Sequence, residues 1–163
     1  MKIFFIMLFL LLFISFITSK KSNHSIQLNL IMKIKSSQEL VEEASKHIET
    51  LEAKEVKLLQ KEEKCVLIDI RDVRELWKEG TIRNSRHIPR GMLEFWLDPQ
   101  SSYYKHGKFD EKKKMVLFCA LGFRSALATK TLTDMGFKNV AHVSGGFESL
   151  KNEGLEIAEK KRN

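Results

Sequence analysis

Cysteine is scarce in this chain, with two residues among 163, Cys65 and Cys119. Two cysteines cannot build the disulfide framework of a small secreted domain. No set of cysteines and histidines has metal-ligand spacing, so the sequence predicts neither a metal nor any other cofactor. Cys65 directly precedes an apolar run and is interpreted as a small apolar residue of the core. Thiol chemistry in this chain is therefore assigned to Cys119.

Acidic residues are absent from residues 1–35, which carry five lysines. The whole chain has a formal net charge of +7, so the remaining residues have a net charge near +2. A nearly neutral surface gives no electrostatic reason to bind a polyanion. The composition therefore predicts no nucleic-acid partner.

Long apolar runs are also missing, with the exception of Ile3–Ile17. This run of fifteen residues is shorter than the roughly 20 that a membrane span needs, and it is typical of a secretory signal or a signal anchor. A competing interpretation starts translation at Met32. Residues 1–19 are thus predicted to be a signal peptide or membrane anchor, or to be untranslated. Residues 3–17 attach the chain to a membrane in the first case, so the protein is exported or anchored, and it is cytoplasmic in the second.

Beyond a linker at residues 20–36, residues 37–163 show no internal repeat and are predicted to form one domain. A capping pattern, Ser36-Ser-Gln-Glu39, marks the start of its first helix. Strands are predicted at Val66–Ile70, Ile82–Ile88, Met115–Phe118 and Val140–Val143, and helices at Glu52–Glu63, Val73–Lys78, Ser125–Met135 and Phe147–Asn152. The polar segment Gln100–Lys114 is predicted to be a long loop. Strands that alternate with helices indicate an α/β fold, with a parallel sheet covered on both faces.

The most informative segment follows the predicted strand Met115–Phe118. It reads Cys119-Ala120-Leu121-Gly122-Phe123-Arg124-Ser125 and leads into a predicted helix. A thiol at this position meets backbone N–H groups and the positive end of the helix. Both features, with Arg124 close by, favour the thiolate form. Cys119 is therefore predicted to be a nucleophile.

This segment resembles the active-site loop of the rhodanese (sulfurtransferase) family, Cys-x-x-Gly-x-Arg. Four further segments are similar to family motifs in the same order along the chain: Val66-Leu-Ile-Asp69-Ile-Arg71 followed by Glu75, Gly80-Thr-Ile82, His87-Ile-Pro89, and Val143-Ser-Gly-Gly-Phe147. The resemblance covers roughly Ser37 to Ile157. It departs from the family at Arg83-Asn-Ser85, Arg86 and Leu150, which all lie outside the cysteine loop.

The resemblance implies a rhodanese-like three-layer fold, with a central, mostly parallel sheet and helices on both faces. It implies a sulfurtransferase in which Cys119 takes a sulfane sulfur from a donor such as thiosulfate and passes it to a thiol acceptor. The loop that binds substrate and persulfide would consist of Ala120, Leu121, Gly122, Phe123, Arg124 and Ser125. Asp69 and Arg71 would support the loop structurally.

Several alternatives stay open at this point. Arg124 either orients an anionic donor or pairs with a carboxylate on a neighbouring helix, and the Ser125 hydroxyl is within reach of the cysteine sulfur. A non-enzymatic rhodanese-like module would bind a partner, and an oxyanion (arsenate) reductase would need a resolving thiol for which Cys65 is poorly placed. Related phosphatases of this fold have a loop one residue longer than Cys119–Arg124, which favours the sulfurtransferase.

Overall fold

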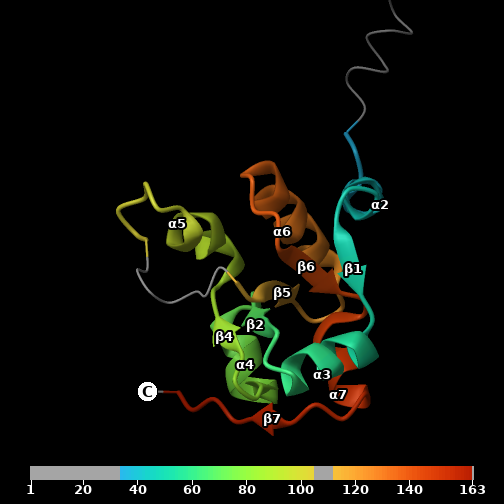
Figure 1. Ribbon diagram of the computed structural model, residues 1–163, viewed down its shortest axis with the longest axis vertical. Helices are drawn as coiled ribbons and strands as arrows, with labels where there is room; N and C mark the ends of the chain where they lie inside the picture. Colours follow the sequence, from blue (N-terminus) through green and yellow to red (C-terminus); the bar gives the residue numbers. More distant parts are fainter. Residues whose placement is uncertain (1–33, 105–111, 163) are drawn as a thin grey trace, which may run out of the picture. The chain divides into compact units, whose positions relative to one another are not determined.

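The computed structural model describes residues 34–104 and 112–162. The chain divides into two units, residues 1–36 and 37–163, and the second contains all of the described helices and strands. Figure 1 shows them in the order α2 (Ser37–Ser45), β1 (Glu49–Leu51), α3 (Ala53–Lys61), β2 (Cys65–Asp69), α4 (Val73–Glu79), β3 (Thr81–Ile82), β4 (Arg86–His87), η1 (Arg90–Met92), α5 (Leu93–Leu97), β5 (Lys114–Phe118), α6 (Phe123–Asp134), β6 (Val140–Val143), α7 (Gly146–Asn152) and β7 (Ile157–Ala158).

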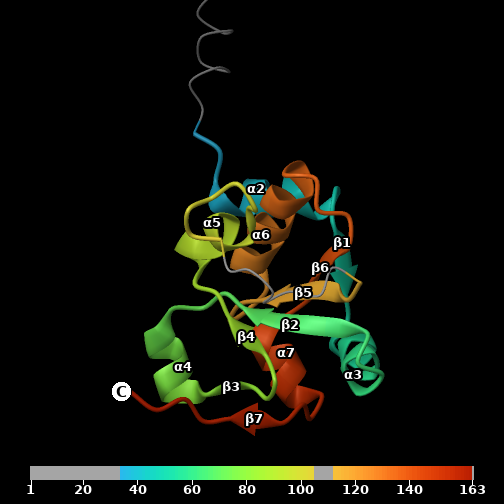
Figure 2. The same ribbon diagram turned by 60° about the vertical axis from the view of Figure 1, so that its left-hand side comes forward.

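The main sheet has five strands in the order β1-β6-β5-β2-β4, and every neighbouring pair is parallel. Successive residues of a strand point to opposite faces, and β2 shows this clearly because Leu67 and Ile68 pack in different apolar clusters. One cluster joins the sheet to α3 and α7, and the other joins it to α5 and α6. Figure 2 shows these helices on opposite sides of the sheet. The predicted α/β layering is confirmed.

Most predicted elements are present within a residue or two of their expected ends. Helix α6 ends at Asp134, one residue before the predicted end, and Gly136 follows with a φ of 100° that allows the Schellman bonds from Gly136 N to Thr133 O and from Phe137 N to Leu132 O. The same helix begins at Phe123, two residues earlier than predicted, because Gly122 turns the chain with a φ of 95°.

The prediction of a single strand over Ile82–Ile88 is wrong. Asn84 has a φ of 64°, and the Ser85 N–H bonds Ile82 O, so the chain turns there. Strand β3 then pairs antiparallel with β7 in a separate two-stranded sheet, while β4 joins the main sheet. The edge strand β1 and strand β7 were not predicted, because they have only three and two residues.

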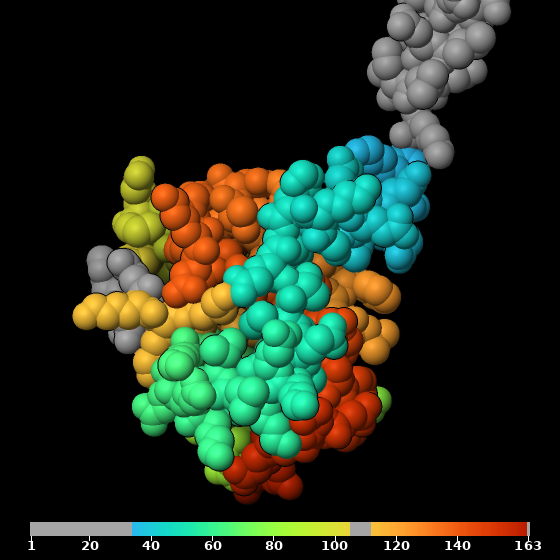
Figure 3. Space-filling view, turned by 45° about the vertical axis from the view of Figure 1, so that its right-hand side comes forward, coloured from blue at the N-terminus to red at the C-terminus, as the bar shows by residue number. Residues whose placement is uncertain are grey.

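Figure 3 shows α2, β1 and α3 running in succession along one side of the molecule. Among residues 34–104 and 112–162, no helix has the length and apolarity needed to cross a bilayer. The Ile3–Ile17 run lies outside these residues, so its predicted role as signal or anchor stays a prediction.

Candidate active site

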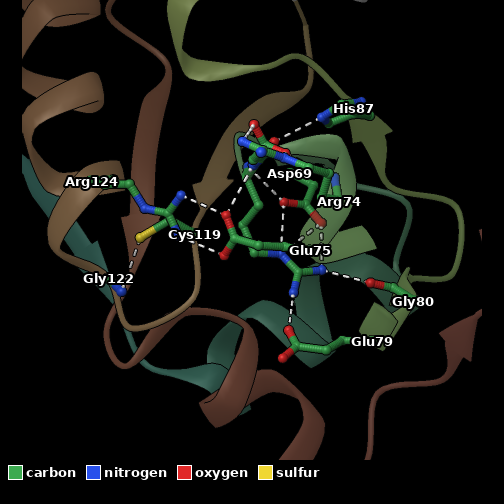
Figure 4. A network of polar contacts seen from close by, with 11 residues as sticks. Asp69, Arg74, Glu75, Glu79, Gly80, His87, Cys119, Gly122 and Arg124 are labelled. Carbon is green, nitrogen blue, oxygen red and sulfur yellow. Dashed lines mark hydrogen bonds and ion pairs between the residues drawn. The ribbon is translucent and has the colours of Figure 1, made fainter. Parts of the chain in front are cut away.

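Cys119 lies at the carboxyl end of β5, where the central strand of the sheet runs into α6. Its side chain is buried, and its sulfur accepts a hydrogen bond of 3.2 Å from the Gly122 N–H. This bond closes the loop on itself, as Figure 4 shows. A backbone N–H aimed at the sulfur at the start of a helix is an arrangement that stabilises negative charge there. One of the expected backbone donors, the Gly122 N–H, therefore lies at the sulfur.

Backbone N–H groups of α7 hold this loop in place. The Phe147 N–H donates to Cys119 O at 2.7 Å, and the Glu148 N–H donates to Ala120 O at 3.3 Å. Gly146 has a φ of 63°, and a Cβ atom on it would lie 2.4 Å from Cys119 O and 2.7 Å from Gly122 N. Only glycine allows the backbones of α7 and the loop to approach this closely.

Arg124, in the first turn of α6, forms a two-pronged ion pair with Glu75 of α4. Its Nη1 and Nη2 atoms each donate to one Glu75 oxygen at 2.8 Å. These bonds raise the pKa of Arg124, and the nearby charge of Cys119 raises it further. The same bonds lower the pKa of Glu75. Arg124 thus stays charged beside the sulfur and is held by a carboxylate of a neighbouring helix.

The Ser125 hydroxyl does not bond the cysteine sulfur as the sequence suggested. It donates to Gly122 O at 2.9 Å, because a serine in the first turn of a helix reaches back to the carbonyl three residues earlier. Its oxygen also lies 3.4 Å from His142 Nδ1, and His142 Nε2 lies 3.0 Å from the Thr50 hydroxyl. Ser125 and His142 are both buried, so this chain of polar groups stiffens the base of the loop.

Asp69 and Arg71 form a buried pair beneath the site, and neither side chain is exposed. Arg71 Nη2 donates to Asp69 Oδ2 at 2.9 Å and to Gly80 O at 2.7 Å, and Nη1 donates to Glu79 at 3.0 Å. The Arg71 guanidinium also lies 3.8 Å from the centre of the Phe147 ring. Because Phe147 N is bonded to Cys119 O, this pair supports the loop through α7.

A comparison with family models matches residues 52–153 to the family described as Rhodanese-like domain. The chain belongs to the rhodanese-like family. The match spans the Cys119 loop, both halves of the Asp69–Arg71 pair and the glycines of α7. Rhodanese-like structural neighbours, among them a rhodanese-related protein from Thermoplasma volcanium at 28% identity and a TM-score of 0.55, have the same fold.

Three similar proteins are informative. A protein of unknown function from Rhodopseudomonas palustris, described as a possible tyrosine phosphatase, is 45% identical with a TM-score of 0.72, covering 78% of this chain and 97% of that one. A polysulfide-sulfur transferase homodimer from Wolinella succinogenes is 34% identical with a TM-score of 0.58, covering 76% and 87%. The thiosulfate sulfurtransferase GlpE from Coxiella burnetii is 31% identical, covering 65% and 87%.

Other relatives are longer than the rhodanese domain. The chain matches a tRNA uridine(34) hydroxylase from Hamiltonella defensa at 34% identity over 96 residues, and it spans 26% of that protein. It spans 60% of a mitochondrial relative from Schizosaccharomyces pombe. Rhodanese-like domains therefore occur in proteins with more than one described activity.

The rhodanese loop brings Cys119, Gly122 and Arg124 together, and it places Leu121 and Phe123 on the surface. His87 lies with its Nε2 atom 2.8 Å from Arg71 O and is half-buried. Sequence reasoning gave no role to Glu75 or to Gly146. Glu75 follows Asp72 by three residues, which the sequence shows as a signal for the start of a helix. Its pairing with Arg124, 49 positions away, has no such local signal.

Within the described ranges, no group of His, Cys, Asp or Glu side chains is placed to hold a metal ion. Cys65 is half-buried, and burial raises the pKa of its thiol to about 11.

Proposed function

We propose that this protein is a sulfurtransferase that carries a sulfane sulfur as a persulfide on Cys119. The observation that supports it most is the Cys119 sulfur at the end of β5, bonded by the Gly122 N–H and flanked by Arg124. An organised donor and a fixed cation at a thiolate stabilise the negative sulfur both before and after transfer. Relatives named thiosulfate sulfurtransferase and polysulfide-sulfur transferase support the same assignment.

The reaction has two halves. The Cys119 thiolate attacks the outer sulfur of a donor such as thiosulfate, an S–S bond forms on Cys119, and the donor's own S–S bond breaks to release sulfite. An acceptor thiolate then attacks the outer sulfur of the Cys119 persulfide, takes that sulfur and restores the Cys119 thiolate. Each step exchanges one S–S bond for another, so no oxidant or reductant is needed. This is covalent catalysis with a ping-pong order.

In this reaction the Gly122 N–H would bind the charged sulfur, and the other N–H groups of the loop over Ala120–Ser125 would help to enclose it. Arg124 would lie beside the persulfide, held in place by its pair with Glu75. Asp69 and Arg71 would act as support, since neither is exposed to a substrate.

The oxyanion reductase alternative is disfavoured by where the second thiol lies. Cys65 pairs with Lys114 at the start of β5, five residues before Cys119. At about 3.3 Å per residue the two Cα atoms are roughly 16 Å apart, too far for a disulfide. This separation argues against a resolving role for Cys65. The alternative of a non-enzymatic partner-binding module is disfavoured because Cys119 and Arg124 are both present and lie side by side, as thiolate chemistry requires.

Incubation of the protein with thiosulfate or polysulfide, followed by intact-mass measurement, tests the proposal. We expect the gain of one sulfur on Cys119, its removal by an added thiol, and no gain in Cys119→Ser. Cys65→Ser is the matched control and should load as the wild type does. Hydrolysis of an aryl phosphate without sulfur loading would contradict the proposal and favour the phosphatase description given to the Rhodopseudomonas protein.

A further inference from the structure

The cation beside Cys119 is already neutralised. Both Arg124 Nη atoms bond Glu75, and the Glu75 Oε2 atom also accepts from the Asp72 N–H at 3.1 Å. This second bond belongs to the capping box of α4, which fixes the carboxylate to its own helix. The Glu75–Arg124 pair is thus anchored at both ends. With Cys119 as thiolate, these three groups carry a net charge of −1 at the mouth of the site.

The mouth of the site is also apolar. Leu121 and Phe123 flank Gly122, the residue whose N–H holds the sulfur, and their exposed fractions are 56% and 54%. An exposed apolar side chain is stabilised when the apolar part of a bound molecule covers it. Figure 4 shows the Arg124–Glu75 pair close beside the Cys119 sulfur, and Leu121 and Phe123 are the chain neighbours of Gly122, which donates to that sulfur.

We propose that the sulfur donor of this site is an organic persulfide with an apolar substituent, and not an inorganic dianion such as thiosulfate. The proposal rests on the sulfurtransferase function proposed above and specifies its substrate class. The Cys119 thiolate attacks the outer sulfur of R–S–SH, forms the Cys119–S–SH persulfide and releases R–S⁻. The apolar R group would lie against Leu121 and Phe123.

Electrostatics separates the two donor classes. A thiosulfate dianion meets a net negative mouth and an arginine whose charge is already matched, so its approach is opposed. An alkyl persulfide brings at most one charge, and that charge lies on the sulfur that Cys119 receives. Glu75 is therefore a specificity-determining residue, since it sets how much of the Arg124 charge is available to an anion.

The test compares single-turnover loading of Cys119, followed by intact mass, with three donors at equal concentration: thiosulfate, 2-hydroxyethyl persulfide and benzyl persulfide. In the wild type we expect benzyl persulfide to load fastest and thiosulfate slowest. Glu75→Gln keeps the helix cap and removes the charge, so thiosulfate loading should rise by about tenfold while benzyl persulfide loading changes little. Glu94→Gln is the matched control, because Glu94 bonds Arg90 and not the loop, and it should change neither rate.

A second variant tests the role of the exposed Leu121 and Phe123 side chains. In Leu121→Ser with Phe123→Ser, the KM for benzyl persulfide should rise to that for 2-hydroxyethyl persulfide, and it should rise by a larger factor than the KM for thiosulfate. Leu58→Ser is the control, because Leu58 is 54% exposed on α3 and should affect no donor. Thiosulfate loading that equals or exceeds benzyl persulfide loading in the wild type would overturn the donor class while leaving the function intact. A thiosulfate rate that falls in Glu75→Gln would do the same. Failure of all three donors to load Cys119 would instead refute the sulfurtransferase function.

Discussion

Arg71 is a fully buried charge whose partners lie on β2, on α7 and at the end of α4. It bonds Asp69, Glu79 and Gly80 and lies over the Phe147 ring. Removal of one partner of a buried pair leaves the other charge uncompensated, which typically costs about 3–5 kcal/mol. We therefore expect Arg71→Met to lower the free energy of unfolding by about this amount, as measured by denaturant titration.

A second arginine provides the control for this prediction. Arg74 pairs with Asp72 at 2.7 Å, but 79% of its side chain is exposed. Ion pairs in water contribute little, so Arg74→Met should change the free energy of unfolding far less than Arg71→Met. Equal losses in the two variants would show that burial of Arg71 is not what makes it important.

The two cysteines should differ sharply in reactivity. Burial raises the pKa of Cys65 to about 11, so this thiol is almost entirely protonated at neutral pH. We expect iodoacetamide at pH 7 to alkylate Cys119 first, as followed by peptide mass mapping, since the Gly122 N–H and Arg124 lie at its sulfur. Equal modification of both thiols across a pH series would contradict this. Unfolded protein, in which both thiols react alike, is the control.

At the scale of elements, the close approach of α7 to the cysteine loop decides the geometry of the site. Gly146→Ala would place a Cβ atom 2.4 Å from Cys119 O, a backbone atom that cannot move aside. Helix α7 and the loop must separate, so we expect loss of sulfur transfer and lower thermal stability. Gly136 also has a positive φ, of 100°, but there is open space around it, so Gly136→Ala is the comparison.

The Gly136 variant therefore isolates the cost of an alanine at positive φ, about 1–2 kcal/mol, from the collision. It should keep its sulfurtransferase activity. If Gly146→Ala also keeps full activity, the contact between α7 and the loop is not needed for catalysis.

Sequence patterns at this scale were informative where the signal is local. The apolar run before Cys119, the glycine at the end of α6 and the alternation of strands and helices predicted most of the elements and the position of the thiol. Strands β3 and β4 were merged because the turn depends on Asn84 at positive φ, which asparagine only sometimes adopts. The Glu75–Arg124 pair and the Gly146 contact join residues far apart in the chain, so no local pattern encodes them.

For the molecule as a whole, the site lies where both layers of helices meet the sheet. Cys119 belongs to the apolar cluster shared with α5 and α6, while its carbonyl is bonded by α7 from the opposite layer. Ligands of parallel α/β sheets bind outside the carboxyl ends of the strands, and the end of β5 is such a position. A substitution that destabilises either layer of helices should therefore also disturb the cysteine loop.

His142 connects three elements of the molecule, because it lies on β6 and contacts Thr50 of β1 and Ser125 of α6. Burial lowers the pKa of His142 below its ordinary value of 6.5, so the folded protein resists a proton that the unfolded chain accepts. Stability should then be unaffected above about pH 6.5 and should fall as the pH decreases below it, until the folded-state pKa is reached. The carboxyl groups of Asp72 and Glu75 also have lowered pKa values and titrate at more acidic pH.

Denaturant titrations at several pH values between about 7 and 5 measure this slope. His142→Gln cannot titrate and should show a flatter dependence than the wild type over the same range. His47→Gln is the matched control, because His47 is exposed between α2 and β1, and this variant should retain the wild-type slope. A wild-type slope that survives in His142→Gln would mean that another group takes up the proton. If the slope is lost, protonation beneath the loop is the route by which mild acid loosens the whole fold.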